Sequence, residues 1–154
     1  MSFIEDKLKD MGLSLPELSP PVANYLPAIA TGKLVFMSGH VPRNADGSLI
    51  VGRVGDDMSV DEAYEIARHV TLSLLASLKQ AIGDLDNVNR IIRVFCMVNA
   101  NAEFSQHPAV ANGASDLLVA VLGDSGKRSR IAAGMGSLPG GVPVEIELIV
   151  ELKG

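Results

Sequence analysis

Ser129–Lys153 reads S-R-I-A-A-G-M-G-S-L-P-G-G-V-P-V-E-I-E-L-I-V-E-L-K, and this stretch decides the fold. Its second half alternates between two kinds of side chain. One set is aliphatic and consists of Val144, Ile146, Leu148, Val150 and Leu152. The intervening set is mostly acidic and consists of Glu145, Glu147, Ile149 and Glu151. This period of two predicts a half-buried β-strand with one apolar face.

The first half of the stretch begins with Arg130, continues as an apolar run and reaches a turn at Leu138-Pro139-Gly140-Gly141. The turn is expected to bring Arg130, at the start of one strand, close to Glu145, at the start of the next. An arginine can hold a carboxylate through two parallel hydrogen bonds, and a glutamate in a partly dry cleft can orient or deprotonate a water. Spacing alone favours the simpler interpretation, a cross-strand ion pair, over a site.

The composition indicates one globular domain that spans residues 1–154. The chain has 154 residues, of which 47% are hydrophobic, which suffices for a core and excludes a disordered chain. The net charge of -5 and the lack of a basic cluster argue against a nucleic-acid partner. Cys96 is the only cysteine, so an internal disulfide is excluded.

Mean hydropathy is +0.27, which is high for a chain of this size that has no membrane span. No window approaches the roughly 18 uninterrupted apolar residues that a span requires. Burial between subunits is therefore the hypothesis for the excess apolar surface. The N-terminus, M-S-F-I-E-D, is acidic where a secretory signal is basic, and the expected location is cytoplasmic.

The residue patterns predict alternating strands and helices. A capping-box pattern at Ser2 and Glu5 predicts a short N-terminal helix, and Pro16, Pro20 and Pro21 predict an extended arm that ends near residue 24. The other expected elements are a hairpin at 25–38, a helix at 60–82, a strand at 88–98, a helix at 110–122 and two closing strands.

The order β-β-α-β-α-β-β predicts an α+β fold, a two-layer sandwich of one mixed sheet with two helices packed on one face. Nothing in the chain is left to cover the other face of the sheet, where charged and aliphatic residues mix. We expect that face to be an oligomer interface, closed into a barrel by symmetry.

Familiar metal-binding and nucleophile patterns are missing from the sequence. His40, His69 and His107 are far apart and lack metal-ligand spacing, so they are interpreted as ordinary solvated histidines and no metal is expected. Cys96 lies in an apolar strand, where a cysteine usually acts as a small hydrophobic residue. Asn112-Gly113 is interpreted as the first turn of a helix, which leaves Asn112 available to a ligand.

Four segments resemble the RidA/YjgF reactive-intermediate deaminase family, which is also called the L-PSP endoribonuclease family. They are Y-L-P-A-I-A-T-G-K-L-V-F-M-S-G-H-V-P (Tyr25–Pro42), F-C-M-V-N-A-N-A-E-F (Phe95–Phe104), N-G-A-S-D-L-L (Asn112–Leu118) and R-I-A-A-G-M-G-S-L-P-G-G-V-P-V-E-I-E (Arg130–Glu147). The arginine, the Leu-Pro turn after it and the V-E-I-E strand are the strongest part of the resemblance. The N-G-A-S-D-L-L segment is similar to a subgroup of longer members.

The resemblance implies a chorismate-mutase-like fold of the bacillus type, assembled as a homotrimeric barrel with a cleft at each subunit interface. The implied activity is hydrolysis of 2-imino or 2-enamino acids to 2-keto acids and ammonia, without a metal or an organic cofactor. Arg130 matches the arginine that binds the substrate carboxylate, and Glu145 matches the acidic residue that orients the attacking water. Tyr25, Ser38 and Asn112 match further positions that line the cleft.

One cleft residue departs from the family pattern. Ile131 stands where a small Ser or Cys usually follows the arginine, so the pocket and its substrate are expected to differ. Three functions stay open. The first is the deaminase, and the second is a module that binds a small keto acid in the same cleft without turnover. The third, RNA cleavage, is disfavoured by the acidic charge balance and the lack of a basic stripe.

Overall fold

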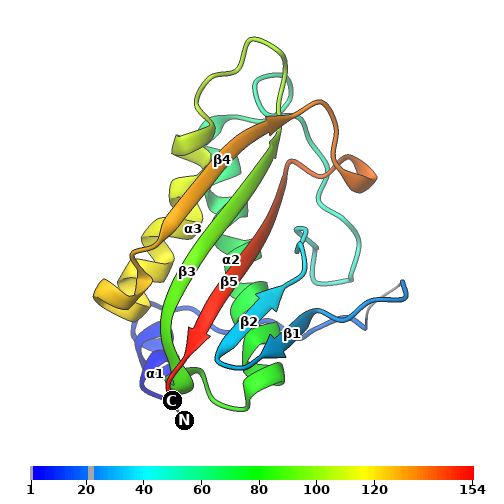
Figure 1. Cartoon of the computed structure of the whole chain (residues 1–154). Helices are drawn as coiled ribbons and strands as arrows, with labels where there is room; N and C mark the ends of the chain where they lie inside the picture. Colours follow the sequence, from blue (N-terminus) through cyan, green and yellow to red (C-terminus); the bar gives the residue numbers. More distant parts are fainter. Residues whose placement is uncertain (1, 21–22) are drawn as a thin grey trace.

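A mixed five-stranded sheet in the order β1-β2-β5-β3-β4 forms the framework of the molecule (Figure 1). The computed structural model describes residues 2–20 and 23–154, and Pro21 of the predicted arm lies outside them. The strands are β1 (Ala28–Thr31), β2 (Leu34–Met37), β3 (Val88–Asn99), β4 (Ser129–Met135) and β5 (Val144–Leu152). The helices are α1 (Phe3–Asp10), α2 (Val60–Ile82) and α3 (His107–Leu122), and short 3-10 turns lie at Leu85–Asn87, Gly123–Gly126 and Pro139–Gly141. The predicted order of elements is confirmed.

The long strand β3 lies between the two strands of the C-terminal stretch. It runs parallel to β4 on one side and antiparallel to β5 on the other. β5 pairs antiparallel with β2, which forms a hairpin with β1. β1 and β4 are therefore the two edges of the sheet, and β4 and β5 are not neighbours although they follow one another in sequence.

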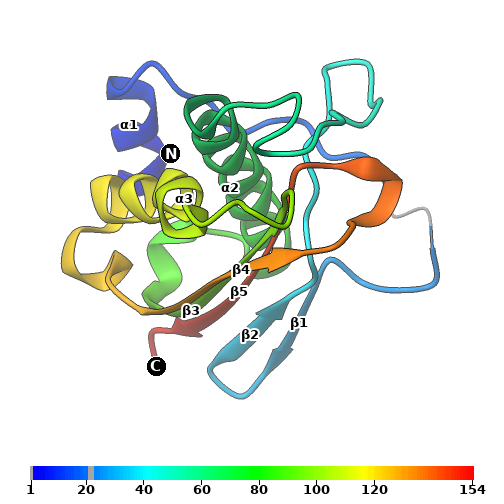
Figure 2. The same ribbon diagram turned by 90° about the horizontal axis from the view of Figure 1, so that it is seen from above.

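The helices lie together on one side of the sheet, and the other side is open (Figure 2). α2 and α3 pack against each other and over the sheet, and α1 joins them at the edge of the helical layer. The predicted α+β arrangement of one mixed sheet with two helices on one face is confirmed.

Both predicted capping boxes are present. At the start of α2 the Ser59 backbone N–H donates to Glu62 Oε2 at 2.8 Å, and the Glu62 N–H donates to Ser59 Oγ at 3.1 Å. Ser2 and Glu5 make the same reciprocal pair at the start of α1. Such a cap stabilises a helix by about 1 kcal/mol. α2 ends before Gly83, whose φ of 85° a side chain rarely adopts.

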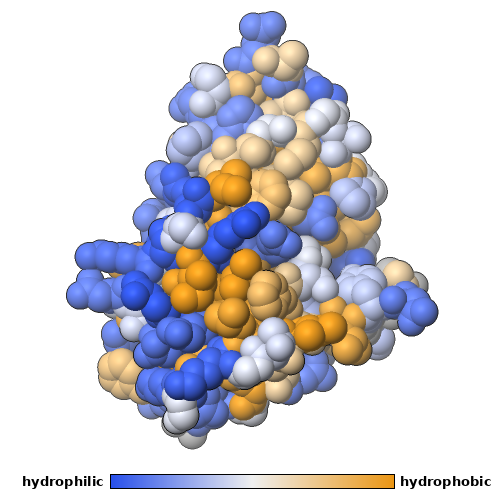
Figure 3. All heavy atoms as spheres, viewed as in Figure 1, coloured by the Kyte–Doolittle hydropathy of each residue, from blue (hydrophilic) through white to orange (hydrophobic). Residues whose placement is uncertain are grey.

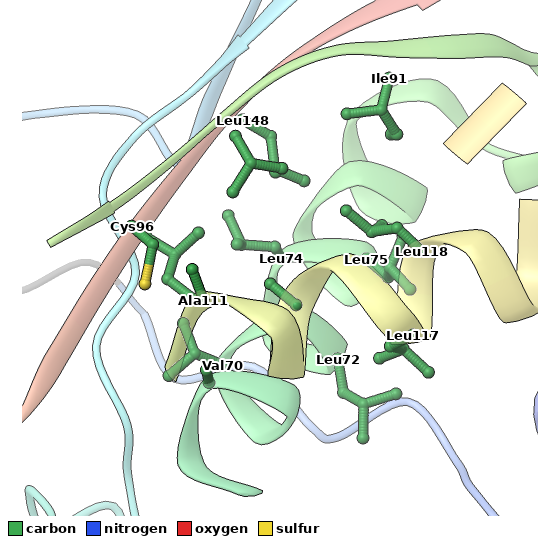
Figure 4. Close-up of a cluster of buried hydrophobic side chains, with 14 of the residues drawn as sticks. Val70, Leu72, Leu74, Leu75, Ile91, Cys96, Ala111, Leu117, Leu118 and Leu148 are labelled. Atoms are coloured by element: carbon green, nitrogen blue, oxygen red, sulfur yellow. The ribbon is translucent and has the colours of Figure 1, made fainter. Parts of the chain in front are cut away.

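The core fills the space between the sheet and the helical layer (Figure 4). Cys96 and Leu148 enter it from β3 and β5, Leu74 from α2 and Leu118 from α3, and none of these side chains is more than 1% exposed. Burying an aliphatic side chain of this size contributes about 1.5–3 kcal/mol. The predicted alternation of β5 is confirmed, because its aliphatic positions from Val144 to Val150 are buried and its acidic positions are not.

The Asn112-Gly113 pair lies inside α3 and not in its first turn, which corrects the prediction. α3 begins at His107, and Pro108 fits the first turn because a missing N–H leaves no hydrogen bond unmade there. Gly113 faces α2, where a Cβ atom would collide with the carbonyl oxygen of Tyr64. The glycine therefore serves close helix packing.

Polar contacts fix α1 against the rest of the helical layer. The Asp86 carboxylate accepts hydrogen bonds from the backbone N–H groups of Phe3 and Ile4 at 2.8 and 3.2 Å. Lys79 Nζ on α2 pairs with Glu5 Oε1 at 2.6 Å. A carboxylate at a helix N-terminus satisfies free N–H groups and complements the helix dipole, so the N-terminal helix is an anchored part of the fold.

The open face of the sheet carries several large apolar side chains, which gather over its strands (Figure 3). Phe36 of β2 and Ile131 of β4 are each 44% exposed, and Ile29 of β1 is 54% exposed. Charged side chains interrupt this surface, among them Arg93 and Glu147, whose nitrogen and oxygen lie 3.7 Å apart. An exposed patch of this kind is typical of a protein interface.

Candidate functional site

Arg130 lies near the start of β4 and points to the helical side of the sheet. It is in register with Val94 of β3, which pairs in turn with Leu148, and both of these residues are buried under the helices. The Arg130 Nη1 group donates to Asn112 Oδ1 at 2.7 Å and to Ser115 Oγ at 3.0 Å. Asn112 and Ser115 lie about one turn apart on α3, so both reach the same nitrogen.

These two contacts leave most of the Arg130 guanidinium available. An arginine has five N–H donors, and α3 engages only those of Nη1. Within the described residues no carboxylate lies at ion-pair distance from Arg130. The edge formed by Nη2 and Nε can therefore grip a carboxylate through two parallel hydrogen bonds.

Glu145 lies near the start of β5 and points to the open face of the sheet. It is in register with Met97, whose side chain lies on the face opposite to that of Cys96. Burial of the Glu145 carboxyl raises its pKa above the ordinary value of 4.5, and the negative charge of Glu147 raises it further. A carboxylate whose pKa lies closer to neutral pH is suited to accept a proton from water.

Arg130 and Glu145 do not meet within one chain. They lie on opposite faces of the sheet, and β3 separates their strands. Their positions along β3 also differ, since Arg130 is level with Val94 and Glu145 with Met97. The prediction that the intervening turn brings them together is wrong, and so is the cross-strand ion pair. The physical reason is that the turn crosses over β3 instead of closing a hairpin.

Tyr25 and Ser38 line a cavity of about 760 Å³ beside the β1–β2 hairpin. This volume is in the usual range of small-molecule sites. Tyr25 is half exposed, and Ser38 Oγ donates to the Leu26 carbonyl oxygen at 2.6 Å. The residue after Ser38 is Gly39, which lies against the Glu145 carboxylate. Glu145 does not line this cavity, and its link to this part of the sheet is the contact with Gly39.

The predicted site residues thus form two groups, which β3 separates. Tyr25, Ser38 and Glu145 form the first group, on the side of β1 and β2. Arg130 belongs to the second group, at the β4 edge, together with Asn112, to which it is hydrogen-bonded, and its neighbour Ile131. Ile131 is in register with Phe95 and points to the open face.

Sequence reasoning missed two residues that position site side chains. Ser115 holds Arg130 together with Asn112, and the signal was present, because residues three apart lie on one face of a helix. Asn112 Oδ1 accepts a hydrogen bond from Arg130, and the side chain is exposed, so its availability to a ligand stays a prediction. Gly39 makes room for Glu145, and only the paired register of the strands reveals that contact.

The histidines are not ordinary solvated residues, which corrects that interpretation. His40 Nδ1 donates to the Ser38 carbonyl at 2.8 Å, and this fixes the tautomer in which Nε2 accepts from Ser77 Oγ at 2.7 Å. Burial lowers the pKa of His40, so the ring stays neutral. His69 Nε2 donates to a backbone carbonyl at 3.0 Å, and His107 packs edge-on against an aromatic ring at 5.0 Å.

Cys96 is a core residue, as predicted. Burial raises the pKa of its thiol to about 12, which leaves it unreactive at neutral pH. In the part of the chain that the structure describes, no group of three or more His, Cys, Asp or Glu side chains is placed to hold a metal ion. None of the helices in residues 2–20 and 23–154 has the length and apolar character to cross a membrane.

Comparison with known proteins agrees with this fold over nearly the whole chain. Residues 5–152 match the family model described as "YjgF/chorismate_mutase-like, putative endoribonuclease". Protein TCP17 of Trypanosoma cruzi is 36% identical over 147 residues, which cover 95% of this chain and 92% of that protein.

Two solved structures share both sequence and fold with the chain. The protein Atu1372 of Agrobacterium tumefaciens, whose function is unknown, is 38% identical with a TM-score of 0.89, and the match covers 98% of this chain and 94% of that one. A protein of Shewanella oneidensis described as a "putative endoribonuclease" is 34% identical with a TM-score of 0.92, over 97% of this chain and 99% of that one. The chain belongs to the YjgF/chorismate mutase-like family, which confirms the resemblance seen in the sequence.

Proposed function

We propose that the protein hydrolyses 2-imino or 2-enamino acids to 2-keto acids and ammonia, in clefts between the subunits of a homotrimer. One observation carries the proposal. The free edge of the Arg130 guanidinium lies on the edge strand β4 and on the helical face, whereas the Glu145 carboxylate lies on the central strand β5 and on the open face, with β3 between the two strands. One chain therefore holds two half-sites, and a complete site needs the first half of one copy and the second half of another.

The surfaces around the two half-sites support such an assembly. Exposed apolar side chains lie on the open face next to both of them, Ile29 and Phe36 near the first and Ile131 near the second. Two different surfaces of one chain that bind each other make a heterologous contact, which closes into a ring when the rotation fits. A ring of three copies covers the open faces and forms the central barrel.

The chemistry requires positioning and one base. Arg130 holds the substrate carboxylate through Nη2 and Nε, and a water held by the partner subunit's Glu145 adds to the carbon of the C=N bond while its proton passes to the carboxylate. The carbinolamine that results gives up its nitrogen as ammonia, and its oxygen becomes the keto oxygen. The balance is one imino acid and one water to one keto acid and one ammonia.

The test is complementation between two inactive variants. Arg130→Ala and Glu145→Ala chains are purified alone and also co-expressed with different affinity tags and purified as mixed oligomers. Each variant alone lacks one half of every site, so neither is expected to release ammonia from 2-iminopropanoate. In a random mixed oligomer about a quarter of the clefts receive both intact halves, so about a quarter of the wild-type activity is expected.

Other results would separate the alternatives. If the mixed oligomers stay inactive while wild-type chains are active, the site does not combine Arg130 and Glu145 from two copies. If Arg130→Ala alone retains full activity, the carboxylate clamp is wrong. If wild-type protein binds 2-oxobutanoate in calorimetry but releases no ammonia from any imino acid, the cleft binds a metabolite without turnover. RNA cleavage is not proposed, since the net charge of -5 disfavours a polyanion.

A further inference from the structure

A second arginine, Arg128, lies beside Arg130 and also reaches toward the helical layer. Its Nη1 donates to the Gly126 carbonyl oxygen at 2.9 Å, just beyond the end of α3. Its Nε is buried and has no hydrogen-bond partner among the described residues. Arg128 precedes Arg130 by two positions, which places the two side chains on one face of the extended chain.

The charges of the two arginines are not neutralised by an ion pair. Within the described residues, no carboxylate lies at ion-pair distance from Arg128 or Arg130. The nearby carboxylate is that of Asp116, which accepts a hydrogen bond from the Tyr64 hydroxyl at 2.7 Å. Burial lowers the pKa of Arg128, the charge of Arg130 lowers it further, and Asp116 acts in the opposite direction.

Two half-buried guanidinium groups side by side cost free energy unless an anion lies between or against them. Arg130 already has one free edge for a carboxylate, and the Arg128 guanidinium beside it makes its hydrogen bond among the described residues through Nη1, which leaves Nη2 for an anion. Positions two apart on an extended chain are about 6–7 Å apart. A diacid of four or five carbons has a comparable span between the groups that bind its two carboxylates.

We propose that Arg128 binds a second carboxylate of the substrate, so that the preferred substrates of this protein are 2-imino dicarboxylic acids. The inference rests on the proposed function and names its substrate class. Arg130 takes the carboxylate next to the imine, as in the reaction above, and Arg128 takes the distal carboxylate. The reaction remains one imino diacid and one water to one keto diacid and one ammonia.

The plainer role for Arg128 is structural, because its bond to Gly126 caps the turn after α3. The two roles predict different selectivity. If the role of Arg128 is structural, its loss lowers kcat/KM for all substrates alike, because it disturbs the position of β4. A distal-carboxylate arginine affects only substrates that carry a second carboxylate.

The experiment compares kcat/KM for 2-iminobutanedioate and 2-iminopropanoate, generated in situ from aspartate and alanine by amino acid oxidases. Wild-type protein is expected to prefer the diacid. Arg128→Leu is expected to lose about 10- to 100-fold on the diacid, the effect of removing a charge-assisted hydrogen bond, and to stay within about twofold on the monoacid. Arg128→Lys, which retains the charge, is expected to recover part of the preference.

Lys127→Met is the matched control. Lys127 is exposed and pairs with Asp124 at 2.9 Å. Its replacement by Met removes one positive charge, as Arg128→Leu does, but one position away. The proposal is overturned if wild-type protein prefers the monoacid, if Arg128→Leu slows both substrates equally, or if Lys127→Met shifts the preference as much.

A binding measurement separates this inference from the proposed reaction. Calorimetry with 2-oxobutanoate and 2-oxoglutarate, stable keto acids with one and two carboxylates, needs no turnover, and it is repeated with Arg128→Gln in case the leucine variant does not fold. If no imino acid is hydrolysed but 2-oxoglutarate binds more tightly in an Arg128-dependent way, the reaction fails and the diacid site stands. If hydrolysis occurs and the binding affinity of neither keto acid depends on Arg128, the proposed reaction stands and the diacid site fails.

Discussion

Gly39 lies directly against the carboxylate of Glu145, so that a Cβ atom on Gly39 would come within 2.5 Å of Glu145 Oε1. The hydrogen side chain of Gly39 is therefore what allows the carboxylate its position on the open face. The φ angle of Gly39 is not in the positive range, so backbone conformation does not require glycine there. A substitution at Gly39 therefore displaces the Glu145 carboxylate without removing it from the chain.

Gly39→Ala is expected to move Glu145 and to lower kcat by about 10- to 100-fold, because a misplaced base no longer aligns its water. The unfolding free energy is expected to change by less than about 1.5 kcal/mol, since the colliding atoms are the end of a flexible side chain. Steady-state kinetics and urea unfolding measure the two effects. Gly136→Ala is the control, because a Cβ there meets nothing within 4 Å. Equal kinetics for Gly39→Ala and wild type would show that the position of Glu145 does not matter.

The pH dependence of activity reports the ionisation of Glu145. Its pKa is raised above 4.5, first by burial and then by Glu147, so kcat/KM is expected to fall on the acid side with an apparent pKa above that value. Glu147→Gln removes the second cause and is expected to move the acid limb to lower pH. The sign for stability is opposite to that for activity: the fold loses stability as the pH rises from 4.5 through the raised pKa. If Glu147→Gln does not move the acid limb of the kcat/KM profile, that limb reports the ionisation of a group other than Glu145.

Local elements of this fold can be read from the sequence because their signals are local. Alternation in β5 and the capping box at Ser59 and Glu62 depend on residues a few positions apart, and both are confirmed. The position of β3 between β4 and β5 depends on which strands pair across long distances, and no short pattern encodes that choice. The fold class was therefore predictable, whereas the strand neighbours were not.

The candidate site shows the same division. The resemblance names Arg130 and Glu145, but their placement on opposite faces follows from their register with Val94 and Met97. A turn between two strands suggested proximity, and the crossover over β3 removed it. The position of Asn112 in its helix was mispredicted for a related reason, because α3 begins at His107, before its apolar pattern starts.

Gly113 sets the distance between α2 and α3. Gly113→Ala places a methyl group against the Tyr64 carbonyl oxygen, a backbone atom that cannot swing away, and is expected to destabilise the fold by about 1–3 kcal/mol. Helix propensity alone predicts the opposite sign, a gain of about 0.5–1 kcal/mol. Urea unfolding decides between them. A variant more stable than wild type would show that the two helices separate easily.

Asn112 and Ser115 fix the orientation of the Arg130 guanidinium, and their loss is expected to weaken binding more than turnover. Ser115→Ala removes the 3.0 Å contact and is expected to raise KM for 2-iminopropanoate by about 3- to 10-fold with kcat nearly unchanged, the cost of one hydrogen bond. Asn112→Asp puts a carboxylate at the 2.7 Å contact, where it neutralises the guanidinium and repels the substrate carboxylate. Its KM is expected to rise by about 100-fold or more, while the new ion pair preserves stability.

Ser73→Ala is the matched control for these variants, because Ser73 is a half-buried serine on α2 and belongs to neither half-site. Its KM is expected to equal that of wild type. A general loss of packing would lower kcat and stability in all three variants together. If instead Asn112→Asp binds 2-oxobutanoate as tightly as wild type does in calorimetry, Arg130 does not bind the carboxylate through the guanidinium that α3 holds, and the second half-site must be placed elsewhere on the β4 edge.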